Sequence, residues 1–559
     1  MSAGRKLLGQ ILKERGIVHE GQIQEALAVQ REKGGLLGAV LVDLGHCDEG
    51  DVAQALAVQS GMEAVSLEGV RPPPEVLAKV DPSTAAVFGV LPLREEKDAL
   101  VVAVADPRNT AVLDDLRFLA GKPVKALLAD EKALREAIGR FYAGKGGGGV
   151  AEALAAAKGE GVSGDAEKMA HAAPVVRLLN AILQQAIRDG ASDVHFEPYE
   201  DQLRIRYRVD GILYPIESPP MHLGPALLSR IKVLANLDIA ETRLPQDGRI
   251  ELVVESRSVD LRVSTLPTMF GETCVLRVLD RSAVRLDLEH LGLRAAEKEA
   301  LRNLLTLPHG IVLITGPTGS GKTTTLYAML SEANDPGRKI LTTEDPVEYD
   351  LDGILQIPIH DDIGVTYAAL LRTILRQDPD VILVGEIRDR ETAQVSIEAS
   401  LTGHLVLSTL HTNDAPSAVT RMVDIGVERF LLTATLEAVV AQRLVRKICA
   451  SCRQPLEADP RLLRELGLPE EAIASGSFAH GRGCDACFHT GFRGRIALFE
   501  ILRMSERLRE QVLESASTDE LLRTARAEGM RSLRENGLLL VAEGVTTVEE
   551  VLRETVASH

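Results

Sequence analysis

Runs of consecutive apolar residues alternate with helical patterns in the second half of the chain. Residues 310–315 and 381–384 are two such runs, and both are rich in β-branched side chains. Strands with this pattern are buried on both faces, which is typical of parallel sheets covered by helices. Residues 291–445 are therefore expected to form an α/β core with a mostly parallel sheet. A charged helical region is expected at 501–559.

A different pattern precedes this core. Residues 203–209 and 259–263 alternate apolar and polar side chains, after a helical stretch at 175–188. Strict alternation predicts strands with one buried and one exposed face. Residues 173–290 are therefore expected to form a second α/β domain, whose strands carry many arginines. The glycine- and alanine-rich stretch 143–172 predicts a flexible linker in front of it.

The first 142 residues predict two smaller units. Residues 8–30 recur at 37–59 with an offset of 29, and each copy predicts a short helix, a glycine turn and a second helix. Repeats this short bury their apolar faces by stacking on each other, so 1–70 is expected to be one helical module. A strand candidate at 101–105, flanked by helical patterns at 110–120 and 130–142, indicates a small α/β unit at 71–142.

The composition argues against a nucleic-acid partner. The chain has 559 residues, a formal net charge of −18 and only 3% aromatic residues. A nucleic-acid binder needs a basic stripe, and a single-strand binder also needs rings on which bases stack. No apolar stretch is long enough to span a bilayer, and the N-terminus lacks a secretory signal. The protein is therefore expected in the cytoplasm.

Residues 316–323 form a complete phosphate-binding loop. Their pattern, G-x-x-x-x-G-K-[ST], follows an apolar strand candidate and precedes a helix start, as the motif requires. In such loops backbone N–H groups cradle phosphates, the lysine reaches the β- and γ-phosphates, and the final hydroxyl ligates Mg²⁺. Lys322 and Thr323 are expected in these two roles. The predicted nucleotide-binding residues are Gly316, Pro317, Thr318, Gly319, Ser320, Gly321, Lys322, Thr323 and Thr324.

Two further strand candidates end in carboxylates. The strand at 381–384 is followed by Glu386, and an acid at this place holds Mg²⁺ or polarises the attacking water. Glu386 is therefore expected to share Mg²⁺ with Thr323. The strand beginning at Ile340 runs into a second cluster of acids, Glu344, Asp345 and Glu348. Because phosphoryl transfer needs a group that orients water, a catalytic role is favoured over a solvated loop.

Three segments resemble the bacterial secretion traffic ATPases, the motors of type IV pilus assembly and type II secretion. They are residues 243–249, 343–349 and 401–413, and the likeness covers nearly the whole chain. The resemblance implies a RecA-like P-loop ATPase core, preceded by a PAS-like α/β domain that bears arginines. It also implies hydrolysis of ATP, with the nucleotide between these two domains.

The resemblance also implies roles for single residues. The family's Asp box corresponds to Glu344, Asp345 and Glu348, and the acid of its Walker B strand corresponds to Glu386. Its His box corresponds to His404 and His411, and a neutral imidazole can donate to a γ-phosphate oxygen and so report its presence. Without the resemblance, two core histidines would be the simpler interpretation.

Arginines of the preceding domain contact the nucleotide phosphates in that family. The matching positions here are Arg249, Arg262 and Arg277. A guanidinium at such a place neutralises charge that develops on the transferred phosphoryl group. A plain surface strand face is expected instead for Arg204, Arg206 and Arg208.

Four cysteines form two C-x-x-C pairs, which predict a zinc site in an insert at 446–500. They are Cys449, Cys452, Cys484 and Cys487. Four thiolates close a tetrahedral, structural zinc site, and redox chemistry or disulfides are the alternative. The family's assembly and secretion motors carry this module, whereas its retraction motors typically lack it. Basic residues nearby are expected to meet an acidic partner or a membrane surface, or to face solvent: Arg443, Arg446, Lys447 and Arg453.

The N-terminal repeat resembles the family's module that binds cyclic di-GMP through two 24-residue motifs. The copies correspond to 7–30 and 36–59, with the family's spacing of five residues between them. The family motif opens with an arginine that contacts the dinucleotide, and this chain has Leu7 and Leu36 there. Loss of both guanidiniums removes strong phosphate contacts. Cyclic di-GMP binding is therefore the less favoured interpretation, and a docking module for a membrane-associated partner is the other.

Taken together, these features predict a cytoplasmic, Mg²⁺-dependent ATPase. The resemblance implies a homohexamer docked at the inner face of the inner membrane on a platform protein, where it drives pilus assembly. Type II secretion is the main alternative. A nucleic-acid motor and a nucleotide sensor without turnover are competing classes, which stimulation by DNA and the absence of phosphate release, respectively, would support.

Overall fold

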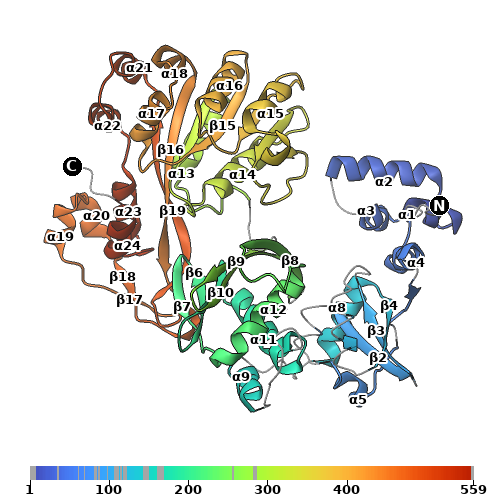
Figure 1. The fold of residues 1–559 in the computed structure, drawn as a ribbon. Helices are drawn as coiled ribbons and strands as arrows, with labels where there is room; N and C mark the ends of the chain where they lie inside the picture. The colour runs from blue at the N-terminus through green and yellow to red at the C-terminus, as the bar shows by residue number, and fades with distance from the viewer. Residues whose placement is uncertain are drawn as a thin grey trace. The chain divides into compact units, whose positions relative to one another are not determined.

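The computed structural model of the chain divides into two compact units, from Met1 to Val284 and from Arg285 to His559 (Figure 1). None of the described helices is long and apolar enough to cross a membrane. The structure describes residues 8–33, 37–60, 62–67, 69–80, 85, 89–96, 98–105, 113, 116–117, 122–142, 150–159, 169–254, 257–280 and 286–555.

The N-terminal repeat forms two helix–turn–helix copies, as predicted. Equivalent glycines in the two turns, Gly16 and Gly45, have positive φ angles of 72° and 70°. Leu12, Leu41 and Ala55 are fully buried in one cluster that the two copies share, so neither copy forms a core alone. The helices are α1 (Leu8–Glu14), α2 (Glu20–Lys33), α3 (Leu37–Asp43) and α4 (Glu49–Ser60).

A four-stranded sheet follows, in the order β1-β4-β3-β2. The strand expected at 101–105 and the helix expected at 130–142 are both present, whereas most of the helical pattern at 110–120 lies outside the described residues. The first strand of this sheet, β1, lies within residues 1–70, which were predicted to form the helical module. The elements are β1 (Glu63–Ala64), α5 (Pro74–Leu77), β2 (Val90–Glu96), β3 (Ala99–Val104), β4 (Val124–Leu128) and α8 (Glu131–Phe141).

The structure differs from the linker that was predicted at 143–172. Its central part forms α9 (Val150–Gly159), which packs on α11 (Ala173–Arg188). Val150, Leu154 and Ala157 are buried in the core of the next domain. These positions are spaced by four and three residues, a helical stripe that the many alanines of the segment obscure.

The arginine-bearing domain is built on an antiparallel sheet in the order β7-β6-β5-β10-β9-β8. One face packs its alternating apolar residues against α11 and α12, which confirms the alternation predicted for 203–209 and 259–263. The other face carries polar and charged side chains. The remaining elements are β5 (Asp193–Pro198), β6 (Leu203–Val209), β7 (Ile212–Pro215), η1 (Met221–Leu223), α12 (Gly224–Leu234), β8 (Gln246–Val254), β9 (Arg257–Thr268) and β10 (Gly271–Asp280).

The second unit contains a seven-stranded sheet in the order β13-β12-β14-β15-β11-β16-β19. Every neighbouring pair is parallel except β16 and β19, which confirms the mostly parallel sheet. Its strands are β11 (Gly310–Thr315), β12 (Ile340–Glu344), β13 (Leu355–Pro358), β14 (Val381–Val384), β15 (Leu405–Leu410), β16 (Leu436–Ile448) and β19 (Phe492–Arg503).

Helices cover both faces of this sheet. Ile311 and Leu313 point into one apolar cluster, with α15 to α18, whereas Val312 and Ile314 point into the other, with α13 and α14. Burial on both faces explains why these strands appear as unbroken apolar runs. The helices are α13 (Ala295–Leu305), α14 (Lys322–Ala333), η2 (Asp361–Ile363), α15 (Tyr367–Ile374), α16 (Arg390–Leu401), α17 (Ala415–Asp424) and α18 (Arg429–Thr435).

β16 and β19 continue beyond β11 as a two-stranded arm that ends at the four cysteines (Figure 1). The ATPase sheet therefore extends to Arg503, past the boundary predicted at 445, and the cysteine insert is shorter than 446–500. The insert contains β17 (Arg453–Pro455), α19 (Pro460–Glu465), α20 (Glu470–Ser475), β18 (Ala479–Gly481) and η3 (Asp485–Cys487). The C-terminal helices are α21 (Glu506–Leu513), α22 (Thr518–Ala527), α23 (Leu533–Ala542) and α24 (Val548–Glu554).

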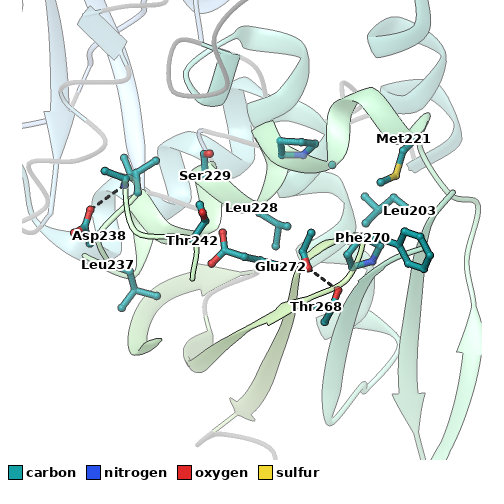
Figure 2. A pocket seen from close by; sticks show the side chains of 16 residues that line it. Leu203, Met221, Leu228, Ser229, Leu237, Asp238, Thr242, Thr268, Phe270 and Glu272 are labelled. Atoms are coloured by element: carbon teal, nitrogen blue, oxygen red, sulfur yellow. Dashed lines mark hydrogen bonds between the residues drawn. The ribbon is translucent and has the colours of Figure 1, made fainter. Parts of the chain in front are cut away.

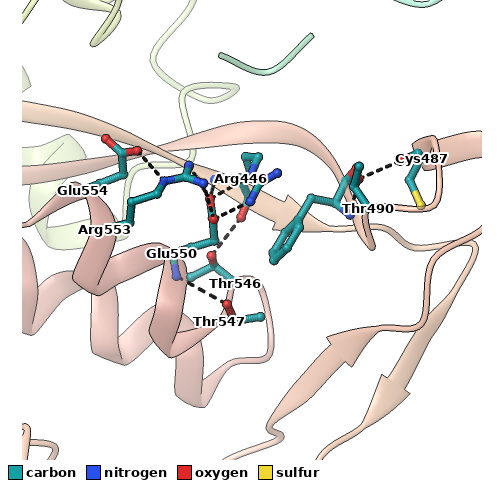
Figure 3. Close-up of polar contacts among 9 residues, drawn as sticks. Arg446, Cys487, Thr490, Thr546, Thr547, Glu550, Arg553 and Glu554 are labelled. Atoms are coloured by element: carbon teal, nitrogen blue, oxygen red, sulfur yellow. Dashed lines mark hydrogen bonds and ion pairs between the residues drawn. The ribbon is translucent and has the colours of Figure 1, made fainter. Parts of the chain in front are cut away.

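A buried ion pair fastens α24 to the arm (Figure 3). The Arg446 guanidinium donates to both carboxylate oxygens of Glu550, at 2.6 and 2.9 Å, and lies 4.2 Å from the centre of the Phe492 ring. Glu550 is only 3% exposed and also accepts from Arg553. Arg443 is buried as well, so these two arginines do not form the basic surface patch that the sequence suggested.

Removal of the Glu550 charge is expected to destabilise the second unit. Glu550→Gln leaves Arg446 largely buried without its counter-charge, and breaking a buried pair in this way costs about 3 kcal/mol. Arg553→Gln is the matched control, because Arg553 is 42% exposed and a surface pair contributes under about 1 kcal/mol. Urea unfolding followed by circular dichroism measures both, and equal midpoints for the two variants would contradict the assignment.

Candidate active site

The phosphate loop lies between β11 and α14, as predicted. Gly316 and Gly321 have φ angles of 151° and 88°, in the region that favours glycine. The Lys322 ammonium donates to the carbonyl oxygens of Gly316 (2.7 Å) and Pro317 (3.1 Å), so the loop closes around its own lysine. Because α14 begins at Lys322, its N-terminal N–H groups favour an anion at this place.

The Lys322 ammonium lies in a field of mixed sign. Burial lowers its pKa to about 8, the negative charge of Glu386 opposes this shift, and the positive charge of Arg443 adds to it. A phosphate group would favour the charged ammonium, since an opposite charge nearby raises the pKa of a lysine. A bound phosphate would therefore oppose the lowering of the Lys322 pKa by burial.

Glu386 follows the carboxyl end of β14 and lies at the same edge of the sheet as the loop. Its side chain is half-buried and makes an ion pair with Arg388. Its Oε2 atom lies 3.4 Å from Nε2 of His411, which follows β15. The structure therefore brings Glu386, His411 and Lys322 into one electrostatic neighbourhood. The exposed Thr323 hydroxyl and the Glu386 carboxylate are oxygen donors, the ligand type that Mg²⁺ prefers.

The three acids at the end of β12 differ in their burial and hydrogen bonding. Glu344 is buried and accepts hydrogen bonds from the hydroxyl of Tyr327, from Oγ1 of Thr342 (2.5 Å) and from Nε2 of Gln356 (3.0 Å). Burial raises the pKa of Tyr327, so its hydroxyl stays protonated and donates. Both oxygens of Glu344 are thereby occupied, and its carboxylate fixes β12 to α14.

The other two acids of this cluster are more accessible. Asp345 is exposed and Glu348 is half-buried. The backbone N–H of Glu348 donates to the Tyr327 hydroxyl oxygen at 3.2 Å, so the same tyrosine holds this loop beside α14. The structure thus keeps the predicted cluster near the helix that follows the phosphate loop.

The two predicted histidines lie at opposite edges of the parallel sheet. His411 follows the carboxyl end of β15, beside Glu386. His404 precedes the amino end of the same strand, where its Nδ1 donates to the carbonyl oxygen of Ala399 at 2.8 Å and so caps α16. The six residues of β15 span about 20 Å, so the structure does not bring His404 to the phosphate loop of its own chain.

The predicted arginines form a single row across the antiparallel sheet. Arg262 is the direct cross-strand partner of Arg249 on one side and of Arg277 on the other. The row continues through Asp193 to Arg208, and Asp193 lies between Nε of Arg277 (3.4 Å) and Nε of Arg208 (3.5 Å).

Sequence reasoning missed the last two members of this row. Strand alternation put Arg208 on the polar face, but only the pairing of β5, β6 and β10 aligns it with Arg277 through Asp193. Arg204 and Arg206 fit the plain strand face that was expected, since Arg204 lies over the Tyr199 ring and Arg206 pairs with Glu197 at 2.6 Å.

A cavity of about 760 Å³ lies in the same domain, between α12 and the turn that joins β9 to β10 (Figure 2). Leu203, Met221, Leu228 and Phe270 give it an apolar lining. Glu272, in the wall of this cavity, forms a buried ion pair with the Lys232 ammonium at 2.6 Å. The cavity contains none of the predicted site residues, and it is separate from the row of arginines.

The four cysteines come together at the end of the β16–β19 arm. Their sulfur atoms all lie within 4.8 Å of one another, and three of the pairs are separated by 3.8 to 4.0 Å. Tetrahedral zinc with Zn–S bonds of about 2.3 Å places sulfurs about 3.8 Å apart, whereas a disulfide needs about 2 Å. The geometry of the donor set therefore fits zinc.

Backbone groups favour the thiolate form within this cluster. Burial would raise the pKa of Cys487, but backbone N–H groups of Cys484 (3.2 Å) and Gly491 (3.3 Å) donate to its sulfur and, together with the thiols of Cys484 and Cys452, lower its pKa to about 6. The turn around Cys487 thus favours the thiolate form of this cysteine, which is the form that binds a metal cation.

Two family models and a solved structure are similar to this chain. A family model described as "Type II/IV secretion system protein" matches residues 168–553, and an MshEN domain model matches residues 60–148. The chain is similar in fold to the ATPase DotB of Yersinia pseudotuberculosis, with a TM-score of 0.52 at 20% identity, over 68% of this chain and 93% of that one.

Two relatives show how far the similarity in sequence extends. The type IV pilus assembly ATPase PilB of Myxococcus xanthus is 43% identical over 557 residues, 98% of each chain. Type II secretion system protein E of Pseudomonas aeruginosa is 52% identical over 383 residues, 68% of this chain and 76% of that one. The chain therefore belongs to the family of type II/IV secretion system proteins, and it is an ATPase of the kind that serves type IV pilus assembly and type II secretion.

Proposed function

We propose that this ATPase powers assembly of a type IV pilus. The observation that carries the proposal is the meeting of the phosphate loop, Glu386 and His411 at one edge of the parallel sheet. The match to a pilus assembly ATPase over 98% of both chains supports the biological role, because it includes the N-terminal module as well as the ATPase core.

In the proposed mechanism, ATP binds with its phosphates at the loop. Lys322 contributes a positive charge beside the terminal phosphates, and Glu386 orients the attacking water. His411 contacts Glu386 and so transmits changes at that carboxylate to the segment that follows β15. Mg²⁺, when bound by Thr323 and Glu386, neutralises charge on the phosphate oxygens.

The row of Arg249, Arg262 and Arg277 is proposed to meet the phosphates when the two units close on the nucleotide. Guanidiniums neutralise charge on the transferred phosphoryl group, and Asp193 keeps the arginine at the end of that row in place. Closure and reopening during each cycle would then be the power stroke. Asp345 and Glu348 are proposed to assist at the same edge, whereas the buried Glu344 has a positioning role.

The chain is proposed to work as a homohexamer in the cytoplasm, at the inner face of the inner membrane, where it drives a platform protein. The N-terminal helices are proposed to dock on a membrane-associated protein. Docking was favoured over cyclic di-GMP binding because Leu7 and Leu36 replace the family's arginines, and this stays a prediction, since both residues lie outside the described part of the chain. His404, which caps α16 in its own chain, is proposed to have a structural role.

Type II secretion is the second candidate function. One observation favours it, namely that identity to a secretion ATPase is higher, 52%, within the 383 residues that match. The ATPase core therefore fits both machines, and the decision depends on what the motor drives in the cell.

A deletion strain separates the two candidate functions. Loss of surface pili with normal secretion of hydrolases is expected, because the proposed motor adds pilin subunits. The wild-type gene should restore pili, whereas Lys322→Ala should not, since it removes the charge that holds the phosphates. Loss of secretion in a strain that keeps its pili would overturn the pilus assignment.

Zinc is expected at one ion per chain. Purified protein should contain it by elemental analysis, and Cys484→Ser should lose it, because three thiolates hold zinc less tightly than four. Cys274→Ser serves as the matched control, since Cys274 is a buried free cysteine of the other unit and is not among the four clustered cysteines. Equal zinc content in the two variants would contradict the site.

A further inference from the structure

β16 lies against the phosphate loop, and its residue Gln442 makes two hydrogen bonds to the loop and to the helix that follows it. Gln442 is 1% exposed. Its Nε2 donates to the carbonyl oxygen of Ser320 at 2.9 Å, and its Oε1 accepts from Oγ1 of Thr325 at 2.8 Å. Ser320 belongs to the loop and Thr325 to the first turn of α14, so one amide joins both to the sheet.

The backbone of the loop also rests on Gln442. A Cβ atom at Gly316 would lie 2.5 Å from the carbonyl oxygen of Gln442, and one at Gly321 would lie 2.9 Å from its Nε2. Both motif glycines are therefore needed for close approach to this residue, as well as for their φ angles. The first and the last glycine of the loop are thus positioned against the same side chain and strand.

A primary amide is suited to this place by its chemistry. It donates and accepts at once, without charge, so it satisfies a buried carbonyl and a buried hydroxyl together. A glutamate cannot donate from an ionised carboxylate, and its charge beneath the phosphates would be repulsive. A buried glutamine that only supports packing would affect stability but not the affinity of the folded protein for nucleotide.

We propose that Gln442 is a positioning residue for ATP hydrolysis, which fixes the loop so that Lys322 and Thr323 stand ready for the phosphates and Mg²⁺. The proposal rests on the proposed nucleotide site at this loop. The neighbouring residue supports it: Arg443 donates to the backbone oxygen (3.2 Å) and side-chain oxygen (2.9 Å) of Asn413, two residues after His411. Consecutive residues of β16 thus hold the two segments that border the site.

The test compares nucleotide affinity with stability in the full-length protein. Gln442→Met, of similar volume, loses both hydrogen bonds and is expected to weaken MgADP binding roughly ten- to thirtyfold by titration calorimetry. Thr325→Val loses one bond and is expected to weaken binding roughly fivefold, whereas Thr325→Ser keeps the hydroxyl and should bind like the wild type.

Thr546→Val is the matched control for Thr325→Val. Both threonines are fully buried, and Oγ1 of Thr546 donates to the Arg446 carbonyl oxygen at 2.8 Å, also on β16 but farther along the arm. The control should lower the unfolding midpoint and leave MgADP affinity unchanged. This contrast separates a positioning role from general stability.

Two results would overturn the proposal. One is wild-type affinity for MgADP in a folded Gln442→Met protein. The other, which decides the matter if that variant does not fold, is unchanged affinity in Thr325→Val. A wild-type protein that binds no MgADP would instead refute the nucleotide site itself, so the two failures are distinguishable.

Discussion

The parallel arrangement of β11, β12, β14 and β15 is the constraint on which the rest of the site depends. Parallel strands end at the same edge of a sheet, so segments that are far apart in sequence meet there. The loop after β11, Glu386 after β14 and His411 after β15 are neighbours for this reason alone. The apolar runs that bury these strands on both faces therefore also determine where the polar chemistry lies.

β16 connects this edge of the sheet with other parts of the second unit. Near its middle it supports the phosphate loop through Gln442, and at its end it leads directly into Cys449. The pair between Arg446 and Glu550 joins the same strand to α24. One long strand thus connects the nucleotide site, the cysteine cluster and α24 within the second unit, which gives the predicted zinc a structural position.

Local patterns were enough to predict much of this molecule. The phosphate loop, the two C-x-x-C pairs and the 29-residue repeat are contiguous motifs whose chemistry is carried by nearby residues. The mostly parallel sheet also followed from apolar runs that only burial on both faces explains. The three arginines Arg249, Arg262 and Arg277 were chosen from the resemblance, whereas only the strand register shows that they lie side by side in a row.

What the sequence could not give depends on partners that are distant along the chain. Glu344 was predicted as a catalytic acid, and the sequence did not indicate that Tyr327 and Gln356 donate hydrogen bonds to its carboxylate. Arg446 looks like part of a surface patch until Glu550, more than a hundred residues away, is placed against it. The helix α9 was hidden by its many alanines, and its buried stripe of Val150, Leu154 and Ala157 depends on packing with α11.

Steady-state phosphate release at saturating MgATP measures whether this edge of the sheet hydrolyses ATP. Turnover is expected for the wild type. A loss of roughly a hundredfold or more is expected in Glu386→Gln, which keeps the shape of the side chain but not its charge. Arg503→Gln, on β19, is the control and should turn over normally. Wild-type turnover in Glu386→Gln, or none in the wild type, would contradict the account.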